Sequence, residues 1–248
     1  MNPRKYETHE SDFLPQRAAE LMCWLCQEAV EARGVAHIAI SGAPLLRGLL
    51  RQLALPRWQE CIPWAHTHIW WTDERCVPPD HPESNYGMAY TLLLQHLPVV
   101  ISHRIRGEES PWEAAQLYEQ ELAEIFDLTE GGWPRFDLIL LGMGEDGHTA
   151  GLYPNTPAPA MRERLTTVGL APTPPHTRIT LTLPVLNHAA HVIFLVAGAS
   201  QGPALFDIFF QDGGEPPLPA AMVQPYHGKL LWLLDREAQV ASGLAIMP

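Results

Sequence analysis

The segment of this chain with the clearest chemical content is the run Gly142-Met143-Gly144-Glu145-Asp146-Gly147-His148-Thr149-Ala150. A histidine has a pKa near neutrality and moves protons at physiological pH, and an acid two residues away can orient it. The interspersed glycines let backbone N–H groups approach a ligand closely. The spacing therefore predicts acid–base chemistry by His148 with Asp146. The simpler alternative is a tight strand-to-helix turn in which the histidine only caps the helix.

The surroundings of this segment favour the functional interpretation. An apolar stretch over residues 136–141 leads directly into it, and Leu152-Tyr153-Pro154 closes it. This pattern predicts a buried strand that stops in a glycine-rich turn. Ligands of open α/β sheets bind outside the carboxyl ends of strands, so the acid and the histidine are expected at a binding edge.

Two arginines are candidates for holding an anionic substrate. Arg75 follows Asp73 and Glu74 just after the strand predicted at 67–71. The alternative for Arg75 is an ion pair with those acidic neighbours. Arg178 begins a second alternating segment, where the alternative is an exposed arginine on an edge strand.

These segments together resemble the 6-phosphogluconolactonase family. The resemblance rests on the histidine segment and on Trp71-Thr72-Asp73-Glu74-Arg75, Glu83-Ser84-Asn85-Tyr86 and Arg178-Ile179-Thr180, and it extends from about residue 36 to 235. It implies a Rossmann-like fold shared with sugar-phosphate isomerases and deaminases. It also implies hydrolysis of 6-phospho-D-glucono-1,5-lactone, a step of the pentose phosphate pathway, with no cofactor and no metal.

Hydrolysis of a lactone needs an activated water molecule and a stabilised oxyanion. His148 is expected to take a proton from water, a contribution that is typically ~100- to 10,000-fold in rate. Asp146 is expected to orient or polarise His148, and the backbone N–H groups of Gly144 and Gly147 are candidate oxyanion donors. Arg75 is expected as a catalytic residue together with His148 and Asp146; the resemblance places it on the substrate and places Arg178 near the phosphate.

Further substrate contacts are expected on the segments that surround the histidine turn. For Asn85, packing or capping is the alternative to substrate contact. The complete set of expected substrate-binding residues is Ser41, Gly42, Asp73, Asn85, Gly144, Gly147, Arg178 and Gln201.

Two departures from the family pattern fall on the expected phosphate contacts. The family usually has Ser-Gly-Gly-Ser-Thr-Pro after its first strand, whereas this chain has Ser41-Gly42-Ala43-Pro44-Leu45-Leu46. Gln201 stands where the family usually has lysine, and glutamine supplies no charge. Losing one charged phosphate contact costs roughly 100-fold in binding. Either Arg47, Arg178 or another arginine compensates, or the substrate is a less phosphorylated lactone, or activity is lost.

Two other functions compete with lactone hydrolysis. Amino-sugar phosphate deaminases and isomerases of this fold usually continue with Ala-Phe-Asn-Glu-Pro after the histidine and carry Asp-Glu-Tyr at the earlier motif. This chain has Ala150-Gly151-Leu152-Tyr153-Pro154 and Asp73-Glu74-Arg75 at these places, which favours the lactonase. A non-catalytic sugar-phosphate-binding protein is the other alternative, suggested by the altered turn at Ser41 and by Gln201.

The segments that must position these candidate residues alternate between predicted strands and predicted helices along the chain. Such alternation predicts parallel βαβ units, hence an α/β fold with a doubly wound, mostly parallel sheet and helices on both faces. We expect a single domain over residues 1–248, with residues 154–177 and 213–219 as loops and room for a small lobe. Strands are expected at 35–40, 67–71, 99–101, 136–141, 178–183, 191–196 and 230–234, and helices at 12–33, 45–55, 84–94, 111–126 and 201–210.

The amino-acid composition limits the kinds of partner that this protein is expected to bind. The 248 residues are 46% apolar, enough for a sizeable core. A net charge of -12 argues against broad nucleic-acid or membrane surfaces. No long apolar run or signal-type segment is found, so a cytoplasmic protein is expected. Because Lys5 and Lys229 are the only lysines, an anion site would be built from arginine and backbone N–H groups.

The cysteines and paired histidines suggest no metal site. Cysteines occur at 23, 26, 61 and 76, and no second close pair completes a zinc site with Cys23 and Cys26. Reduced thiols are therefore expected. His66 and His68 are expected on one face of a strand, but no third ligand lies in register, so structural roles are favoured.

Overall fold

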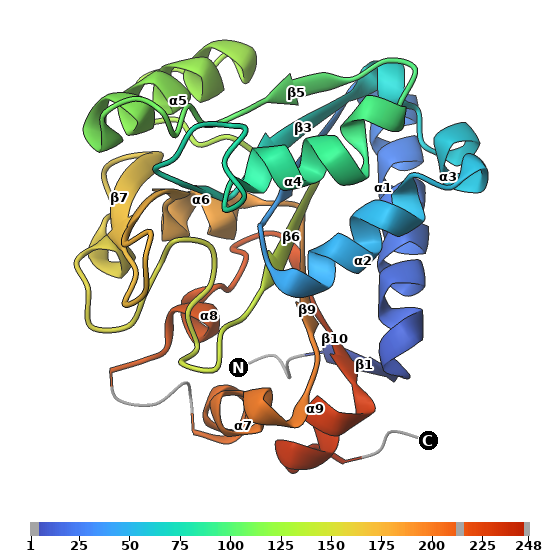
Figure 1. The fold of residues 1–248 in the computed structure, drawn as a ribbon, viewed down its shortest axis with the longest axis vertical. Coiled ribbons are helices and arrows are strands. Elements are labelled where there is room, and N and C mark those ends of the chain that lie inside the picture. Colours follow the sequence, from blue (N-terminus) through green and yellow to red (C-terminus); the bar gives the residue numbers. More distant parts are fainter. Residues whose placement is uncertain (1–4, 212–215, 246–248) are drawn as a thin grey trace.

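The computed structural model describes residues 5–211 and 216–245, and a seven-stranded parallel sheet forms its centre (Figure 1). The strand order is β1-β10-β9-β6-β2-β3-β5. The predicted doubly wound α/β fold is confirmed. The strands are β1 (Lys5–His9), β2 (Ala36–Ile40), β3 (Thr67–Trp71), β5 (Ile101–His103), β6 (Leu138–Gly142), β9 (His191–Val196) and β10 (Lys229–Asp235).

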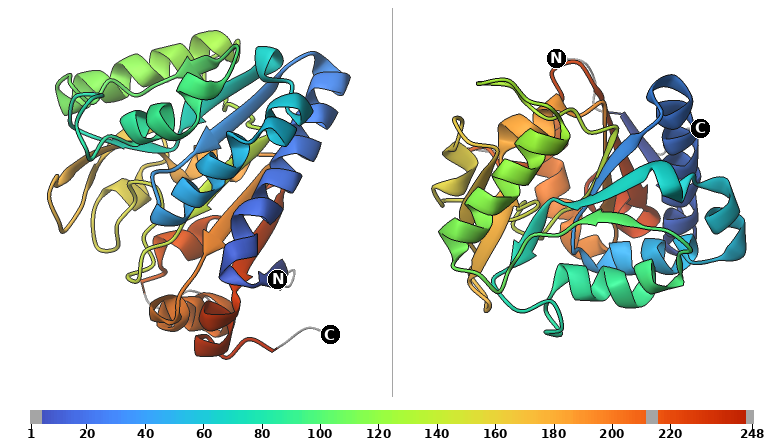
Figure 2. Two further views of the ribbon diagram at one scale, coloured as in Figure 1. Left: turned by 45° about the vertical axis from the view of Figure 1, so that its right-hand side comes forward. Right: turned by 90° about the horizontal axis from the view of Figure 1, so that it is seen from above.

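Helices cover both faces of this sheet. One face carries α1 (Leu14–Arg33), α2 (Pro44–Leu53) and α4 (Asn85–Leu92), and the opposite face carries α5 (Pro111–Ile125) and α6 (Leu183–His188) (Figure 2). The remaining short helices are α3 (Pro56–Cys61), α7 (Gly202–Phe210), α8 (Pro219–Met222) and α9 (Arg236–Ala241). None of the helices in the described ranges is long and apolar enough to cross a membrane.

A second, antiparallel sheet lies beside the α5 face. It consists of β4 (Asp73–Arg75), β8 (Thr177–Leu181) and β7 (Thr166–Leu170), in the order β4-β8-β7. The prediction of an edge strand at 178–183 is wrong, because β8 is hydrogen-bonded on both sides. Residues expected as loop contribute β7, whose mixed composition of threonine, glycine and valine gives a weak strand signal.

The central strands were predictable because they are buried on both faces. Every residue of β6 is buried, as is nearly all of β9, so both read as continuous apolar runs. Two helices end or begin at residue types that favour these positions. Gly34 ends α1 in the left-handed conformation at φ 79°, and the Ser84 hydroxyl at the start of α4 accepts a hydrogen bond from Gly87 N at 3.0 Å.

Several elements differ from the sequence-based expectations. β1, α6 and α8 were not predicted, and β5 begins two residues later than expected. β1 reads as polar, since the segment is Lys-Tyr-Glu-Thr-His, and it becomes a strand by pairing with β10. The expected loop at 213–219 lies partly outside the described residues. The single-domain organisation over residues 1–248 stays a prediction.

The prediction of reduced thiols is wrong for one cysteine pair. Cys23 on α1 and Cys61 at the end of α3 form a disulfide, with their Cα atoms 6.1 Å apart. They are separated by 38 residues, so only the packing of the two helices brings them together. Cys26 is free and buried, and Cys76 is free and partly exposed.

Candidate active site

The turn that follows β6 is closed by its own hydrogen bonds. Gly144 N donates to His148 O and Gly147 N donates to Gly144 O, each at 2.9 Å. The Thr149 hydroxyl donates to Gly142 O at 2.8 Å and so ties the end of the turn to its beginning. The N–H groups of Gly144 and Gly147 therefore already donate within the turn. Neither is free to serve as the oxyanion donor that the sequence predicted.

His148 and Asp146 form the predicted pair. Asp146 Oδ1 lies 2.5 Å from His148 Nδ1 and also accepts the backbone N–H of His148 at 3.1 Å. A Cβ on Gly144 would overlap with His148 Nδ1, so this position must be glycine for the pair to form. Both side chains stay partly exposed, at 30% for His148 and 44% for Asp146.

The pair fixes the protonation of its members. Burial raises the pKa of Asp146, but the hydrogen bond and charge of His148 outweigh burial and leave this pKa below its usual value. Asp146 is therefore a carboxylate at neutral pH and accepts the Nδ1 proton of His148. With Nδ1 donating to Asp146, Nε2 is the ring nitrogen that is left to accept a proton from water.

Tyr153 was not predicted as a site residue. Its ring stacks on the His148 ring, with centroids 4.2 Å apart and an interplanar angle of 21°. It belongs to the segment that closes the histidine turn, and its contact depends on how that turn folds back. An aromatic residue five positions after a candidate base was the only signal that the sequence offered.

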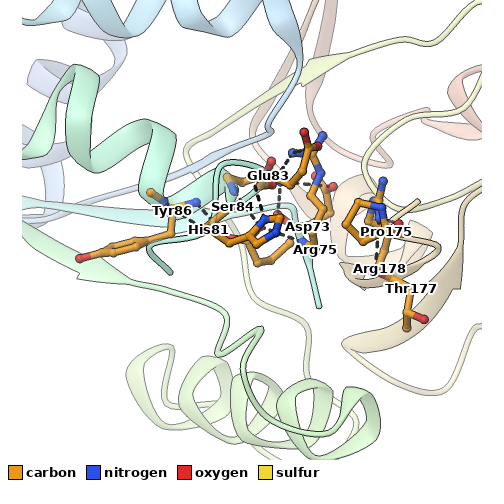
Figure 3. Close-up of polar contacts among 12 residues, drawn as sticks. Asp73, Arg75, His81, Glu83, Ser84, Tyr86, Pro175, Thr177 and Arg178 are labelled. Atoms are coloured by element: carbon orange, nitrogen blue, oxygen red, sulfur yellow. Dashed lines mark hydrogen bonds and ion pairs between the residues drawn. The ribbon is translucent and has the colours of Figure 1, made fainter. Parts of the chain in front are cut away.

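Arg75 and Arg178 lie directly opposite each other in the second sheet. The antiparallel register of β4 and β8 pairs Arg75 with Arg178, and Figure 3 shows them projecting from adjacent strands. Arg178 is only 5% exposed, and its Nη1 donates to the carbonyl oxygens of Pro175 and Thr177. No carboxylate of the described chain forms an ion pair with Arg178.

Arg75 is held by its neighbours but keeps unused donors. Its Nη1 donates to Glu83 O at 2.6 Å, and the Glu83 carboxylate lies 3.9 Å away on the surface. Its Nε is buried and has no hydrogen-bond partner among the described residues. Two arginines that are partners in the strand register, with few carboxylates paired to them, therefore favour an anion at this place.

Glu74 does not neutralise Arg75 but organises the backbone around it. Its carboxylate accepts backbone N–H bonds from Arg75 and Asn85 at 2.7 Å and from Tyr86 at 2.8 Å. Burial raises the pKa of Glu74, while these N–H donors act in the opposite direction. In place of the alternative of an ion pair between Arg75 and Glu74, the Glu74 carboxylate links β4 to the start of α4.

Three of the predicted substrate-binding residues, Ser41, Asp73 and Asn85, are buried, and Gly42 packs against one of them. Ser41 Oγ accepts a hydrogen bond from Gly142 N at 3.3 Å, which links the ends of β2 and β6. Asn85 is 1% exposed and its Nδ2 donates to Asp73 O at 2.8 Å. Asp73 is also buried, and Gly42 packs so closely that a Cβ there would overlap with the Asn85 amide. This arrangement fits the packing alternative for Asn85.

The two remaining positions considered for the phosphate lie apart from each other. With its amide oriented to satisfy its hydrogen bonds, Gln201 donates to the carbonyl oxygens of Met143 and Gly144 at 3.2 Å each. It therefore holds the histidine turn. Arg47 lines a separate groove of about 600 Å³ between α2, the loop at 79–82 and α4, and neither Arg75 nor Arg178 lines that groove.

The histidines do not gather around a metal position. His66 precedes β3 in a short 3-10 turn, so the prediction that it shares a strand face with His68 is wrong. His68 Nδ1 lies 2.9 Å from His103 Nε2, and His103 Nδ1 lies 2.6 Å from Glu121 Oε1. Over residues 5–211 and 216–245, no group of three or more His, Cys, Asp or Glu side chains is placed to hold a metal ion.

Comparison with known proteins gives consistent matches across the chain. The family model for glucosamine-6-phosphate isomerases/6-phosphogluconolactonase matches residues 9–232. A 6-phosphogluconolactonase of Synechocystis is 42% identical over 229 residues, which cover 91% of this chain and 92% of that protein. The solved 6-phosphogluconolactonase of Trypanosoma cruzi superposes with a TM-score of 0.86 at 26% identity, over 96% of each chain. A monomeric glucosamine-6-phosphate deaminase shares the fold, with a TM-score of 0.77 at 20% identity over 96% of this chain and 99% of that one.

Proposed function

The chain belongs to the glucosamine-6-phosphate isomerase/6-phosphogluconolactonase family, and we propose that it hydrolyses 6-phospho-D-glucono-1,5-lactone to 6-phosphogluconate. Its curated relatives at high identity and coverage are named as 6-phosphogluconolactonases, which supports an enzyme of this kind. The observation that carries the proposal in this chain is a candidate base whose turn is followed by a segment that packs on β8, where Gly151 N donates to the Thr180 hydroxyl at 3.0 Å. His148, oriented by Asp146, lies on the turn after β6, and Arg75 faces Arg178 in the neighbouring sheet.

The base acts through the nitrogen that Asp146 leaves free. In the proposed first step, His148 Nε2 takes a proton from a water molecule while the water oxygen forms a bond to the lactone carbonyl carbon. The carbonyl electron pair moves onto its oxygen and gives a tetrahedral oxyanion. Asp146 keeps its charge and stabilises the imidazolium through the 2.5 Å contact.

The second step opens the ring. The bond between the former carbonyl carbon and the ring oxygen breaks, and His148 returns its proton to that oxygen, which becomes a hydroxyl group. The new carboxylic acid then loses its proton to solvent. No oxidant, reductant or cofactor is needed for the balance of this reaction.

We assign the phosphate of the substrate to the two arginines of the second sheet. Arg178 is buried and lacks a carboxylate partner in the described chain, and Arg75 retains a buried Nε donor without a partner. A phosphate dianion would use these donors in charge-assisted hydrogen bonds. We expect Gln201, in contrast, to act by holding the histidine turn.

The deciding experiment compares two lactones with purified protein. Hydrolysis of 6-phosphogluconolactone and of unphosphorylated gluconolactone is followed by proton release, with spontaneous hydrolysis subtracted. We expect a strong preference for the phosphorylated lactone and loss of most activity in His148→Ala. The matched control is His227→Ala, because His227 is an exposed histidine that lies outside the histidine turn.

Each outcome bears on a separate part of the proposal. Turnover close to that of the wild type in folded His148→Ala would eliminate His148 as the base. Equal rates on the two lactones would show that the arginines do not select a phosphate.

We also propose a cytoplasmic location and action without nucleic-acid or membrane partners, in keeping with the net charge of -12.

A further inference from the structure

The histidine turn leaves one chemical requirement of lactone hydrolysis unmet. An oxyanion develops on the carbonyl oxygen and needs a hydrogen-bond donor aimed at it. The N–H groups of Gly144 and Gly147 already donate within the turn, at 2.9 Å each. Another donor close to His148 must therefore fill this role.

Tyr153 carries a hydroxyl group and stacks on the His148 ring. The two rings are nearly parallel, with an interplanar angle of 21° and centroids 4.2 Å apart. A stack of this kind fixes the ring of Tyr153 relative to the base. The phenol is thereby carried on the same rigid unit as the nitrogen that would activate water.

The hydroxyl of Tyr153 is free to meet a ligand. The residue as a whole is 8% exposed, yet its hydroxyl hydrogen-bonds to no described residue. It does not belong to the fully buried polar atoms that lack a partner, so the oxygen reaches solvent. A buried ring with a solvated, unpartnered hydroxyl is the arrangement expected when a substrate supplies the missing partner.

The electrostatic surroundings place this phenol among the site residues. Burial is the main cause that raises the pKa of Tyr153, and the charges of Arg178, Asp73, Asp146 and Arg75 all act on it. The phenol therefore keeps its proton at neutral pH, as a hydrogen-bond donor must. The position of Tyr153 at the site is given by its stack on the His148 ring.

We propose that Tyr153 is a further catalytic residue, whose hydroxyl donates a hydrogen bond to the carbonyl oxygen of the bound lactone and stabilises the oxyanion that forms there. This inference rests on the proposed lactone hydrolysis. Tyr153 keeps its own proton throughout, so the proton balance of the two steps is unchanged. The stacked ring has a second effect, since it holds His148 in the orientation set by Asp146.

Two substitutions separate the hydroxyl from the ring. Tyr153→Phe removes the donor and keeps the stack, whereas Tyr153→Leu removes both. Removing a donor that stabilises only the oxyanion lowers kcat and leaves KM unchanged. For Tyr153→Phe we expect kcat on 6-phosphogluconolactone to fall about 10- to 100-fold, with KM within about twofold. Tyr153→Leu is expected to lose more, because the ring of His148 is also released.

Tyr90→Phe is the matched control, because Tyr90 is an exposed tyrosine on α4 outside the site. Its kcat should equal that of the wild type, and the melting temperature of Tyr153→Phe should stay near the wild-type value because the stack is kept. A kcat for Tyr153→Phe within twofold of an active wild type would overturn this inference alone. A larger KM with unchanged kcat would also overturn it. A wild type that hydrolyses no lactone would overturn the proposed function and this inference with it.

Discussion

Replacing Asp146 by asparagine tests the link between the histidine turn and catalysis. Asparagine has nearly the shape of aspartate but no charge, so the change leaves the turn intact and alters the partner of His148 Nδ1. In the wild type the carboxylate of Asp146 both fixes the tautomer and stabilises the imidazolium that forms when water is deprotonated. The amide introduced by Asp146→Asn keeps at most a neutral hydrogen bond.

The magnitude follows from the geometry of the pair. A hydrogen bond to a charged group contributes about 1.5–3 kcal/mol and a neutral one about 0.5–1.5 kcal/mol, so the loss is on the order of 1–2 kcal/mol. The 44% exposure of Asp146 lets solvent screen its charge, which argues against a larger effect. This loss corresponds to a decrease of about 5- to 30-fold in kcat.

The assay is steady-state hydrolysis of 6-phosphogluconolactone by Asp146→Asn, with kcat and KM measured separately. KM should change little, because Asp146 is not assigned to the phosphate. The control is Glu145→Gln, which removes an exposed negative charge one residue away and should leave kcat unchanged. A kcat for folded Asp146→Asn within twofold of the wild type would refute the catalytic role of the pair.

Three further perturbations test the packing around the site. Gly42→Ala forces Asn85 to move and should cost about 1–3 kcal/mol in urea unfolding, whereas adding Asn85→Ala should return part of this loss; full additivity would contradict the predicted clash. Cys61→Ser opens a loop of 38 residues closed by Cys23 and should lower stability by roughly 2–4 kcal/mol, and thiol reductant should destabilise the wild type but not the variant. The pKa of His37 is lowered from 6.5 to about 4, first by burial and then by neighbouring histidines, so the folded state favours neutral His37. The free energy of unfolding should therefore fall as pH decreases below about 6.5 towards 4, and an equal fall in His37→Asn would rule out His37 as its cause.

The sequence predicted the strands that consist of an uninterrupted run of buried apolar residues. β6 and β9 are interior strands of a parallel sheet, so their local composition already reflects their surroundings. β1 and β7 could not be found in this way, because each becomes a strand through its pairing with a partner strand. β1 pairs with β10, and β7 pairs with β8.

The same distinction applies to the candidate site. His148 and Asp146 were predictable because two residues of separation within one glycine-rich turn determine their contact. Arg75 and Arg178 were predicted singly, but their adjacency depends on the antiparallel register of two short strands more than 100 residues apart. Tyr153 was missed because ring stacking requires knowledge of the turn geometry. Local contacts can thus be inferred from spacing, whereas contacts between strands need the register.

The arginine pair explains how an acidic protein can bind a dianion. A net charge of -12 repels a phosphate at long range, but charges beyond about 8–10 Å are largely screened at physiological ionic strength. The Arg178 guanidinium donates to the Thr177 carbonyl oxygen and the Arg75 guanidinium donates to Glu83 O at 2.6 Å, so both charges are already held before a ligand binds. Fixed guanidinium groups lose little side-chain entropy on binding, which offsets the absence of the mobile lysine that related enzymes usually carry at the position of Gln201. In the proposed assignment the phosphate is held by the arginines of the second sheet, while Gln201 donates to the carbonyl groups of the histidine turn.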